Sequence, residues 1–237
     1  MKNKFLLLAL PFLLILNGCA ELQSVINTLP QTGPVGEAEI GMGLKQALEF
    51  GVIEGVDILG QKDGYFKDQA VRILLPNELQ KVDQTLRSIG LSALADEGLR
   101  VLNRAAEDAV TEAKPIFVSA IKGLTFQDAM GILTGNNQSA TTYLKNRTTS
   151  SLVTAFEPRI QNSLDKVGAN EVWSNIIEKY NSVPLVKPVN PNLTEYVTQK
   201  AIDGLFVKVG NKEIEIRNNI SARTTPLLQR VFAMQDK

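Results

Sequence analysis

Residues 37–60 read EAEIGMGLKQALEFGVIEGVDILG, and the order of apolar and small residues in this stretch predicts a packed helix. Gly51 and Gly55, four positions apart, would let a second helix approach closely. Charged residues interrupt the apolar run, so we expect a helix in a soluble core and not a membrane span. The apolar side chains that recur at helical spacing are Ile40, Leu44, Ala47, Leu48, Val52, Val56 and Leu59.

The same spacing recurs along the chain and predicts an all-α fold, a compact multi-helix domain of about eight to ten helices over residues 37–237. Pro115 would mark a kink or the first turn of a helix, Ser92 an N-cap, and Thr125 with Asp128 a capping box. Further helices are expected at 77–90, 92–115, 125–133, 139–145, 149–167, 171–180, 194–209 and 223–234. The buried side of the 171–180 helix is predicted to carry Val172, Trp173, Ile176, Ile177 and Tyr180.

Two stretches fit more than one structure. Residues 206–216, FVKVGNKEIEI, alternate apolar and polar side chains around Gly210-Asn211, which is typical of a β-hairpin. The apolar residues from Ile202 to Ile220 also keep a broken helical spacing, so both structures stay open there. Residues 65–75 fit an extended or partly helical segment. Short extended segments near 65–75 and 206–216 are therefore an alternative within the helical domain.

The first residues of the chain predict where the protein is located. Lys2 and Lys4 precede an apolar run over residues 5–16, which is shorter than the ~20 residues of a membrane-spanning helix. Such a run has the proportions of a secretory signal. It ends in Leu16-Asn17-Gly18-Cys19, which resembles the lipobox of bacterial lipoproteins.

The lipobox resemblance implies that Cys19 is lipidated and begins the mature chain, after removal of a signal peptide over residues 1–18. Several acyl chains on one residue hold a protein firmly, since each buried methylene adds ~0.8 kcal/mol. Ala20 follows the cysteine, and by the same resemblance the absence of an aspartate at this position implies sorting to the outer membrane, with the domain facing the periplasm. Residues 19–36 would form the lipidated N-terminus and a tether. The alternative is an ordinary signal peptide in which the cysteine occurs by chance.

The composition excludes several classes of function. The 237 residues include no histidine, which excludes Ser-His-Asp and Cys-His catalysis and histidine metal sites. A single cysteine excludes an internal disulfide and any cysteine-rich metal cluster. With 25 basic and 25 acidic residues, the chain gives no reason to expect a nucleic-acid partner. We expect no cofactor; the expected partners are the membrane, through Cys19, and a protein of the cell envelope.

Several short phrases, taken in order, resemble the bacterial domain-of-unknown-function family 4197, whose members are secreted or lipidated. The resemblance covers residues 36–234, implies an all-α domain and favours helix over hairpin at 206–216. It implies no activity and no catalytic residues. The phrases are Ile73-Leu74-Leu75-Pro76, Asn103-Arg104-Ala105-Ala106-Glu107, Pro115-Ile116-Phe117, Ala120-Ile121, Thr125 with Asp128-Ala129, Ile132-Leu133-Thr134-Gly135, Ala140-Thr141-Thr142-Tyr143-Leu144, Asp203-Gly204-Leu205-Phe206, Ile216-Arg217, Ala222-Arg223-Thr224-Thr225 and Val231-Phe232.

The candidate functional residues are polar. Asn103 and Glu107 lie four positions apart, as do Arg104 and Asp108, so each pair shares a helix face. This cluster fits either part of a ligand site or a structural polar network, and the flanking alanines favour the network. The candidate polar site comprises Asn103, Arg104, Glu107, Asp128 and Tyr143.

A metal site is a weaker interpretation of the same carboxylates. Asp128 with Glu107, Glu112 or Asp108 could supply oxygen ligands to a hard cation, but no stretch has EF-hand spacing. We therefore interpret Asp128 as a helix-start residue and expect no metal.

These observations favour a non-catalytic interaction or scaffold module that Cys19 recruits to the membrane. One alternative is a carrier of a small ligand or lipid, with a cavity lined by the 40–59 helix and polar groups near Arg104. A carboxylate-dependent enzyme ranks third, because the usual general bases are missing and carboxylates would have to carry all of the catalysis. A deep apolar cavity would favour the carrier, and inward carboxylates with a raised pKa would favour the enzyme.

Overall fold

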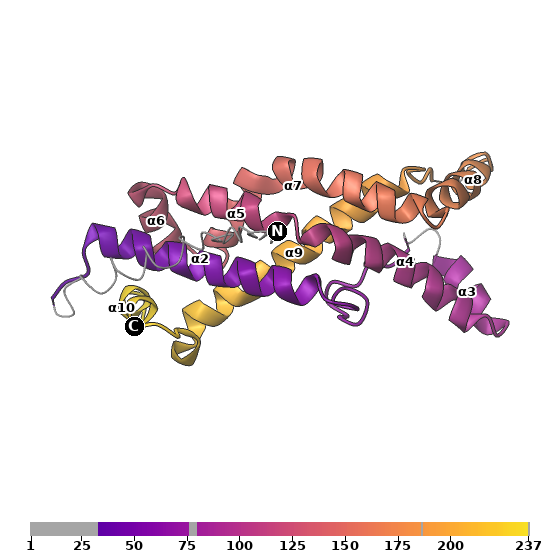
Figure 1. Ribbon diagram of the computed structural model, residues 1–237. Coiled ribbons are helices and arrows are strands. Elements are labelled where there is room, and N and C mark those ends of the chain that lie inside the picture. The colour runs from indigo at the N-terminus through magenta and orange to yellow at the C-terminus, as the bar shows by residue number, and fades with distance from the viewer. Residues whose placement is uncertain (1–32, 76–79, 186, 237) are drawn as a thin grey trace, which may run out of the picture. The chain divides into compact units, whose positions relative to one another are not determined.

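The computed structural model describes residues 33–75, 80–185 and 187–236, whose path is drawn in Figure 1. Over these ranges the chain is helical and contains no strand, which confirms the predicted all-α fold. The unit from residue 35 onward is compact. The predicted signal peptide, Cys19 and most of the predicted tether lie outside the described residues. The helices are α2 (Glu37–Leu59), α3 (Gln80–Ser88), α4 (Ser92–Val110), α5 (Ala113–Lys122), α6 (Phe126–Leu133), α7 (Ser139–Asp165), α8 (Ala169–Asn181), α9 (Leu193–Asn218), the 3₁₀ helix η2 (Ile220–Ala222) and α10 (Pro226–Ala233).

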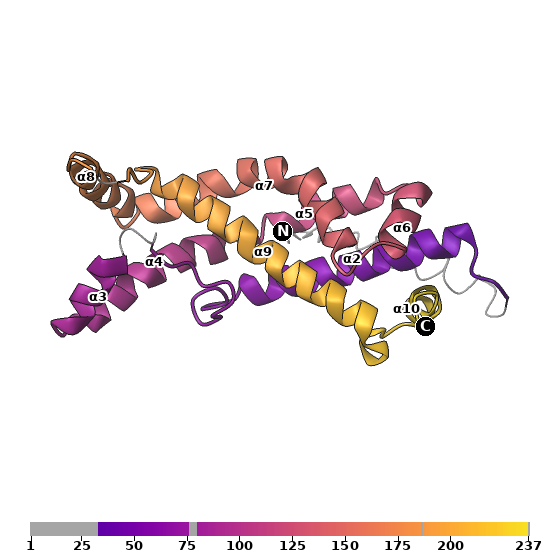
Figure 2. The ribbon, with the colours of Figure 1, turned by 180° about the vertical axis from the view of Figure 1, so that it is seen from behind.

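Within this unit the long helices α7 and α9 pack against each other, and α9 crosses α2 diagonally (Figure 2). The α4 helix packs against α7 and α9, whereas α2 packs against α5, α6, α9 and α10. Both α3 and α8 lie at one end of the unit, and α6, α10 and the start of α2 lie at the other (Figures 1 and 2). The core therefore combines helices that are far apart in the sequence.

The glycines of α2 let two other helices approach closely. A Cβ added at Gly51 or Gly55 would lie 3.6 or 3.4 Å from a lysine side chain of α9. A Cβ at Gly43 would lie 2.6 Å from Val231 Cγ2 on α10, which leaves no room for a methyl group. The predicted approach of a second helix at Gly51 and Gly55 is confirmed, and that helix is α9.

The described helices are short or charged compared with a membrane-spanning helix. No single described helix meets the length and apolarity of a span, whereas α5 and α6, bent by 105°, meet them only as a pair.

The ambiguous stretch 206–216 is the second half of α9 and not a hairpin. Its apolar residues Val209 and Ile216 are buried, and a Cβ at Gly210 would lie 3.5 Å from Thr141 Oγ1 on α7. Glu213, one of the polar residues that create the alternation, is buried and bonded at the start of α7. Contacts with other helices therefore select the helix over the hairpin.

The other ambiguous stretch, residues 65–75, forms turns and irregular backbone without a strand. Tyr65 is fully buried, and its hydroxyl donates a hydrogen bond to the Ala201 carbonyl of α9 at 2.7 Å. A Cβ at Gly204 would lie 2.8 Å from Tyr65 Cε1, so only glycine leaves space for the ring. Packing against α9, and not strand pairing, holds this segment.

Three local predictions are wrong. The predicted helices at 139–145 and 149–167 are one helix, α7, with Pro158 inside it; Pro158 is exposed, so water can reach the carbonyl it leaves unbonded. Ser92 lies inside α4 and is not the N-cap, because Leu91 takes that position. On α8, Val172 and Ile176 are 59% and 49% exposed, because the groove described below leaves that side uncovered.

Candidate functional site

The predicted polar cluster on α4 binds the irregular segment 63–73. Asn103 is fully buried, and its Oδ1 accepts a hydrogen bond from the Ile73 N–H at 2.8 Å. Its Nδ2 donates to the Ile73 carbonyl at 2.9 Å and to the Leu99 carbonyl at 2.8 Å. The side chain thus satisfies both backbone groups of a residue that has no secondary-structure partner.

Glu107 performs a similar role one turn further along α4. Its carboxylate accepts hydrogen bonds from the backbone N–H groups of Asp63, Tyr65 and Phe66 at 3.1, 3.2 and 3.4 Å. Arg104 forms an ion pair with it at 2.8 Å. Burial, followed by the charge of Glu107, raises the pKa of Tyr65. The Glu107 carboxylate therefore binds the backbone of residues 63–66 and the Arg104 side chain.

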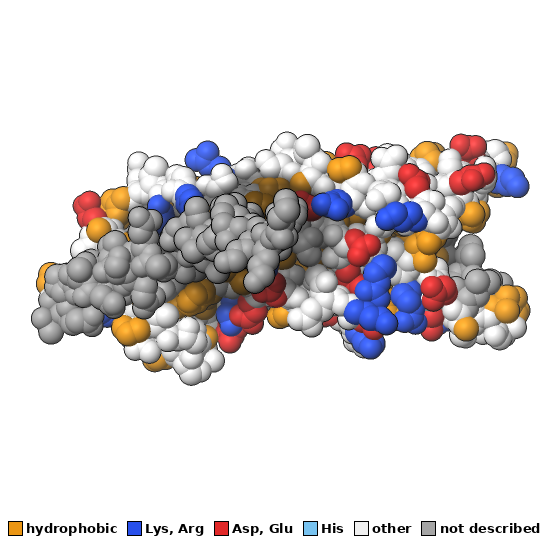
Figure 3. Space-filling model, in the orientation of Figure 1, with side chains coloured by type: hydrophobic (Ala, Val, Ile, Leu, Met, Phe, Trp, Pro, Cys, Tyr) orange, Lys and Arg blue, Asp and Glu red, His pale blue; other side chains and the backbone are white. Residues whose placement is uncertain are grey.

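The Asp63 carboxylate lies at the edge of this network. The backbone of Asp63 has a φ of 66°, in the left-handed region that non-glycine residues rarely adopt. A hydrogen bond from Lys67, with the nearby arginines, lowers the pKa of Asp63. Phe66 is covered on its faces by Arg72 and Arg100, whose guanidinium carbons lie 4.2 and 4.7 Å from the ring centroid. Figure 3 shows cationic side chains interspersed with carboxylates over this segment and α4.

The other two predicted site residues lie elsewhere. Asp128 accepts from the Thr125 N–H at 3.1 Å, and its own N–H donates to Thr125 Oγ1 at 3.1 Å, which confirms the predicted capping box. Hydrogen bonds from Thr125 lower the pKa of Asp128. Tyr143 lines a shallow groove of about 520 Å³ between α5 and α7, where the Arg147 guanidinium lies 5.6 Å from its ring centroid. The five predicted residues therefore do not form one site.

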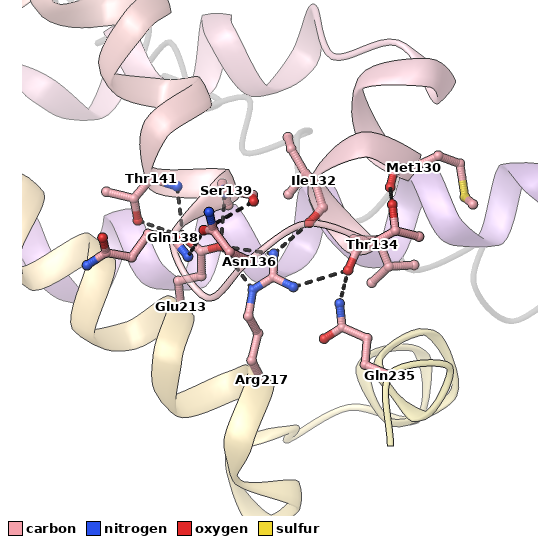
Figure 4. A network of polar contacts seen from close by, with 12 residues as sticks. Met130, Ile132, Thr134, Asn136, Gln138, Ser139, Thr141, Glu213, Arg217 and Gln235 are labelled. Carbon is pink, nitrogen blue, oxygen red and sulfur yellow. Dashed lines mark hydrogen bonds and ion pairs between the residues drawn. The ribbon is translucent and has the colours of Figure 1, made fainter. Parts of the chain in front are cut away.

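A second polar network, which the sequence analysis missed, joins α6, α7 and α9 (Figure 4). Glu213 accepts hydrogen bonds from the first two backbone N–H groups after the Ser139 start of α7 at 2.9 and 2.8 Å, and from the Thr141 hydroxyl at 2.7 Å. Arg217 donates to Glu213 at 3.0 Å and to the last two carbonyls of α6 at 2.7 and 3.2 Å. The pair thus caps the start of α7 and the end of α6, where its charges complement the helix dipoles.

Both side chains of this pair are almost fully buried, at 7% exposure for Glu213 and 3% for Arg217. Their spacing of four residues is the signal that sequence analysis could have used. That signal is weak, because Lys212 and Glu215 form a similar but more exposed pair on the same helix.

Two further arginines fasten the C-terminal segment. Arg223 is buried and donates to the Ile216 and Arg217 carbonyls of α9 at 3.0 and 2.9 Å. It also pairs with Asp236 at 2.6 Å, and this hydrogen bond lowers the pKa of Asp236. Arg230 of α10 pairs with Glu39 at the start of α2 at 2.5 Å. These polar clusters hold helices together.

The carboxylates of the described ranges do not gather further. No group of three or more acidic or cysteine side chains within those ranges could hold a metal ion. The cavity between α2 and α9, lined in part by Leu44 and Gly51, has a volume of about 20 Å³ and accommodates about one water molecule.

An apolar groove of about 450 Å³ lies between α4 and α8. Buried leucines of α4 and α9 line its depth, and Val172 and Ile176 of α8 are exposed along one side. Trp173, the only tryptophan in the chain, lies in the same wall at 7% exposure. Figure 3 shows hydrophobic side chains at the surface of this end of the unit. This groove is the candidate binding site.

Two features of the groove concern what could enter it. A Cβ added at Gly98 of α4 would have no neighbour within 4 Å among the described residues, and Gly98 itself is exposed, so this wall is open there. The charged residues that line the groove are Asp83 of α3 and Glu97 of α4, both carboxylates. The groove is thus apolar in its depth and acidic at its rim.

Comparison with known proteins identifies the family. The sequence model of the family described as "Protein of unknown function (DUF4197)" matches residues 34–233. The chain belongs to the DUF4197 family. No curated protein and no solved structure gives a significant match.

The DUF4197 phrases noted in the sequence coincide with the joints of the fold. They contain Asn103, Glu107, Gly204, Arg217 and Arg223, each of which holds or accommodates a neighbouring segment. The groove residues Gly98, Trp173 and Ile176 lie outside those phrases. The matched range, residues 34–233, nevertheless includes the groove as well as these joints, and Leu75 of the first phrase lines the groove.

Proposed function

We propose that this DUF4197 protein is an outer-membrane lipoprotein, anchored through Cys19, that serves as a non-catalytic interaction module of the cell envelope. Its binding surface is the groove between α4 and α8. The N-terminal sequence supports the anchor, because the lipobox-like residues 16–19 follow an apolar run of secretory length.

The observation that carries the binding proposal is the exposure of apolar side chains along the groove. Val172 and Ile176 are 59% and 49% exposed although they lie on the side of α8 that faces α4. Covering what remains exposed of these two side chains would stabilise a complex by about 1–3 kcal/mol. Exposed apolar surface of this kind is typical of a binding site.

The polar clusters support a non-catalytic role. Glu107 and Glu213 accept several backbone hydrogen bonds each and pair with an arginine. A general base needs a free lone pair directed at a substrate, and these carboxylates have theirs engaged within the fold. The carboxylate-dependent enzyme is therefore the least supported of the three functions.

The carrier stays the second candidate, and the groove is the observation that favours it. The cavity between α2 and α9 accommodates about one water molecule, so a carried molecule would need an open groove, and the α4–α8 groove with its exposed Val172 and Ile176 offers one. A lipid chain could contact the same apolar side chains as a protein partner.

The anchor is tested by replacing Cys19 with alanine in the native host. We expect the unmodified chain in the outer-membrane fraction and the Cys19→Ala variant as an unprocessed precursor or in the soluble periplasmic fraction. Unchanged processing and membrane attachment of the variant would refute the anchor.

The binding surface is tested by photo-crosslinking in intact cells. A photoreactive phenylalanine replaces Ile176 in the groove or, as the control, Phe126, which is 39% exposed on α6 at the other end of the unit. Protein adducts from position 176 alone would support the proposal. Adducts with lipid alone would favour the carrier. Protein adducts from position 126 alone would support an interaction module whose binding surface is not the groove.

A further inference from the structure

We propose that the α4–α8 groove binds one amphipathic helix of a partner protein, whose apolar face enters the groove and whose flanking lysines or arginines meet Asp83 and Glu97. This inference rests on the proposed function and names the chemistry of the partner.

The shape of the α4 wall favours a helix. Ala95 and Gly98, three positions apart on α4, both line the groove and carry little or no side chain there, beside the buried Leu99 and Leu102. Helices pack at 8–10 Å between axes, and small side chains at the contact allow the closer distances. An extended peptide usually adds to the edge of a sheet, and the described part of this chain has no strand to offer.

Gly98 is one of three helical glycines, with Gly41 of α2 and Gly131 of α6, that no contact with the described residues explains, and of these three only Gly98 lines the groove. Within a helix, glycine destabilises by about 0.5–1 kcal/mol relative to alanine. At Gly43 and Gly204 a Cβ would collide with a neighbour, which explains those glycines. At Gly98 a Cβ would have no described neighbour within 4 Å, so no contact among the described residues requires glycine there. The backbone of a partner that passes closely over this position would require glycine there.

The charges at the rim favour a cationic partner. Asp83 pairs with Arg87 at 2.9 Å, and Glu97 lies 3.3 Å from Arg100 Nε, yet neither arginine lines the groove. The Glu97 side chain is 65% exposed and available to a second cation. Anionic lipid headgroups would meet two carboxylates here, whereas lysine or arginine would find complementary charge.

Trp173 provides the measurement, because it is the only tryptophan and lies in the groove wall. The lipidated full chain, in nanodiscs of zwitterionic phospholipid, is titrated with synthetic helical peptides that contain no tryptophan. The peptides share one leucine- and alanine-rich apolar face and carry either lysine or glutamate at their flanks. We expect a saturable change in Trp173 emission with the lysine peptide, and binding about tenfold weaker with the glutamate peptide.

A matched pair of glycine variants tests the place of binding. Gly98→Phe fills the groove wall, whereas Gly131→Phe places the same side chain on α6, where a Cβ also has no neighbour within 4 Å. We expect Gly98→Phe to weaken the lysine peptide about tenfold or more and Gly131→Phe to change it less than about twofold. Circular dichroism of both variants checks that the helical content is unchanged.

Several results would overturn the inference. These are equal affinity for the two peptides, equal affinity of the two variants, or no response of Trp173 to either peptide. A Trp173 change with anionic phospholipid alone, lost in Gly98→Phe, would assign the groove to a lipid. A change that depends only on protein concentration would assign it to a second copy of the chain. Protein crosslinks from position 176 without any peptide response would leave the proposed function intact and refute only the helical partner.

Discussion

Replacing Glu213 with alanine should destabilise the protein more than any surface substitution on the same helix. The carboxylate is 7% exposed and accepts two backbone N–H groups of α7, the Thr141 hydroxyl and Arg217. Its loss leaves the Arg217 guanidinium, which is 3% exposed, without a counter-charge. Removing one partner of a buried ion pair costs about 3–5 kcal/mol of unfolding free energy.

The effect is large enough to measure by urea unfolding followed by circular dichroism. With a slope of about 2–3 kcal/mol per molar urea for a chain of this size, the midpoint should fall by about 1–2 M. Glu213→Gln keeps an acceptor but removes the charge, so its loss should be smaller, about 1–3 kcal/mol.

The matched control is Glu215→Ala, two residues further along α9. Glu215 is 47% exposed and pairs with Lys212 on the surface, so its removal should change the unfolding free energy by less than about 0.5 kcal/mol. If Glu213→Ala destabilises no more than Glu215→Ala, the capping network does not stabilise the fold and the reasoning is wrong.

Three other substitutions test separate parts of the structure. Gly204→Ala should destabilise by about 1–3 kcal/mol because its Cβ would lie 2.8 Å from Tyr65 Cε1, whereas Gly41→Ala, with no neighbour within 4 Å, should be neutral or stabilising in the same urea assay. Asn103→Leu should lower the thermal midpoint, because the buried N–H and carbonyl of Ile73 lose their hydrogen-bond partner, at a cost of about 1–3 kcal/mol of unfolding free energy each. An unchanged midpoint would contradict the structural role of Asn103. Hydrogen bonds from its capping partner lower the pKa of Asp128 below 3.8 in the folded state, so the ionised carboxylate stabilises the fold well above that pH. The stability gap between the unmodified chain and Asp128→Asn should therefore be present at about pH 7 and shrink as the pH falls through the lowered pKa; a gap that grows on acidification would refute the sign.

Local patterns predicted most helices of the fold. The spacing of apolar residues over 40–59 identified α2, and Gly51 and Gly55 indicated that another helix passes close to it. The Thr125 and Asp128 side chains predicted the start of α6 because a capping box involves only residues three positions apart. Pro115 was expected in a first helical turn or at a kink and lies in the first turn of α5.

The candidate site was harder to predict. The interpretation of Asn103 and Glu107 as a structural network is consistent with their buried hydrogen bonds, but their partners lie 30 to 44 positions away. The pattern on α8 predicted Val172 and Ile176 as buried, since periodicity shows that a face is apolar and not whether anything covers it. The groove therefore came from the structure alone.

The amino-acid sequence by itself determined the helical class, the family and the positions of most helices, because these depend on neighbours within one or two helical turns. Only the tertiary structure decided that 206–216 is helical, since Glu213 finds its hydrogen-bond donors 72 and 73 residues away on α7. It also decided that α4 and α8 leave an apolar groove between them. Both outcomes depend on which helices meet in space, and side-chain burial and pairing across such contacts are set by the whole packed unit and not by any local stretch.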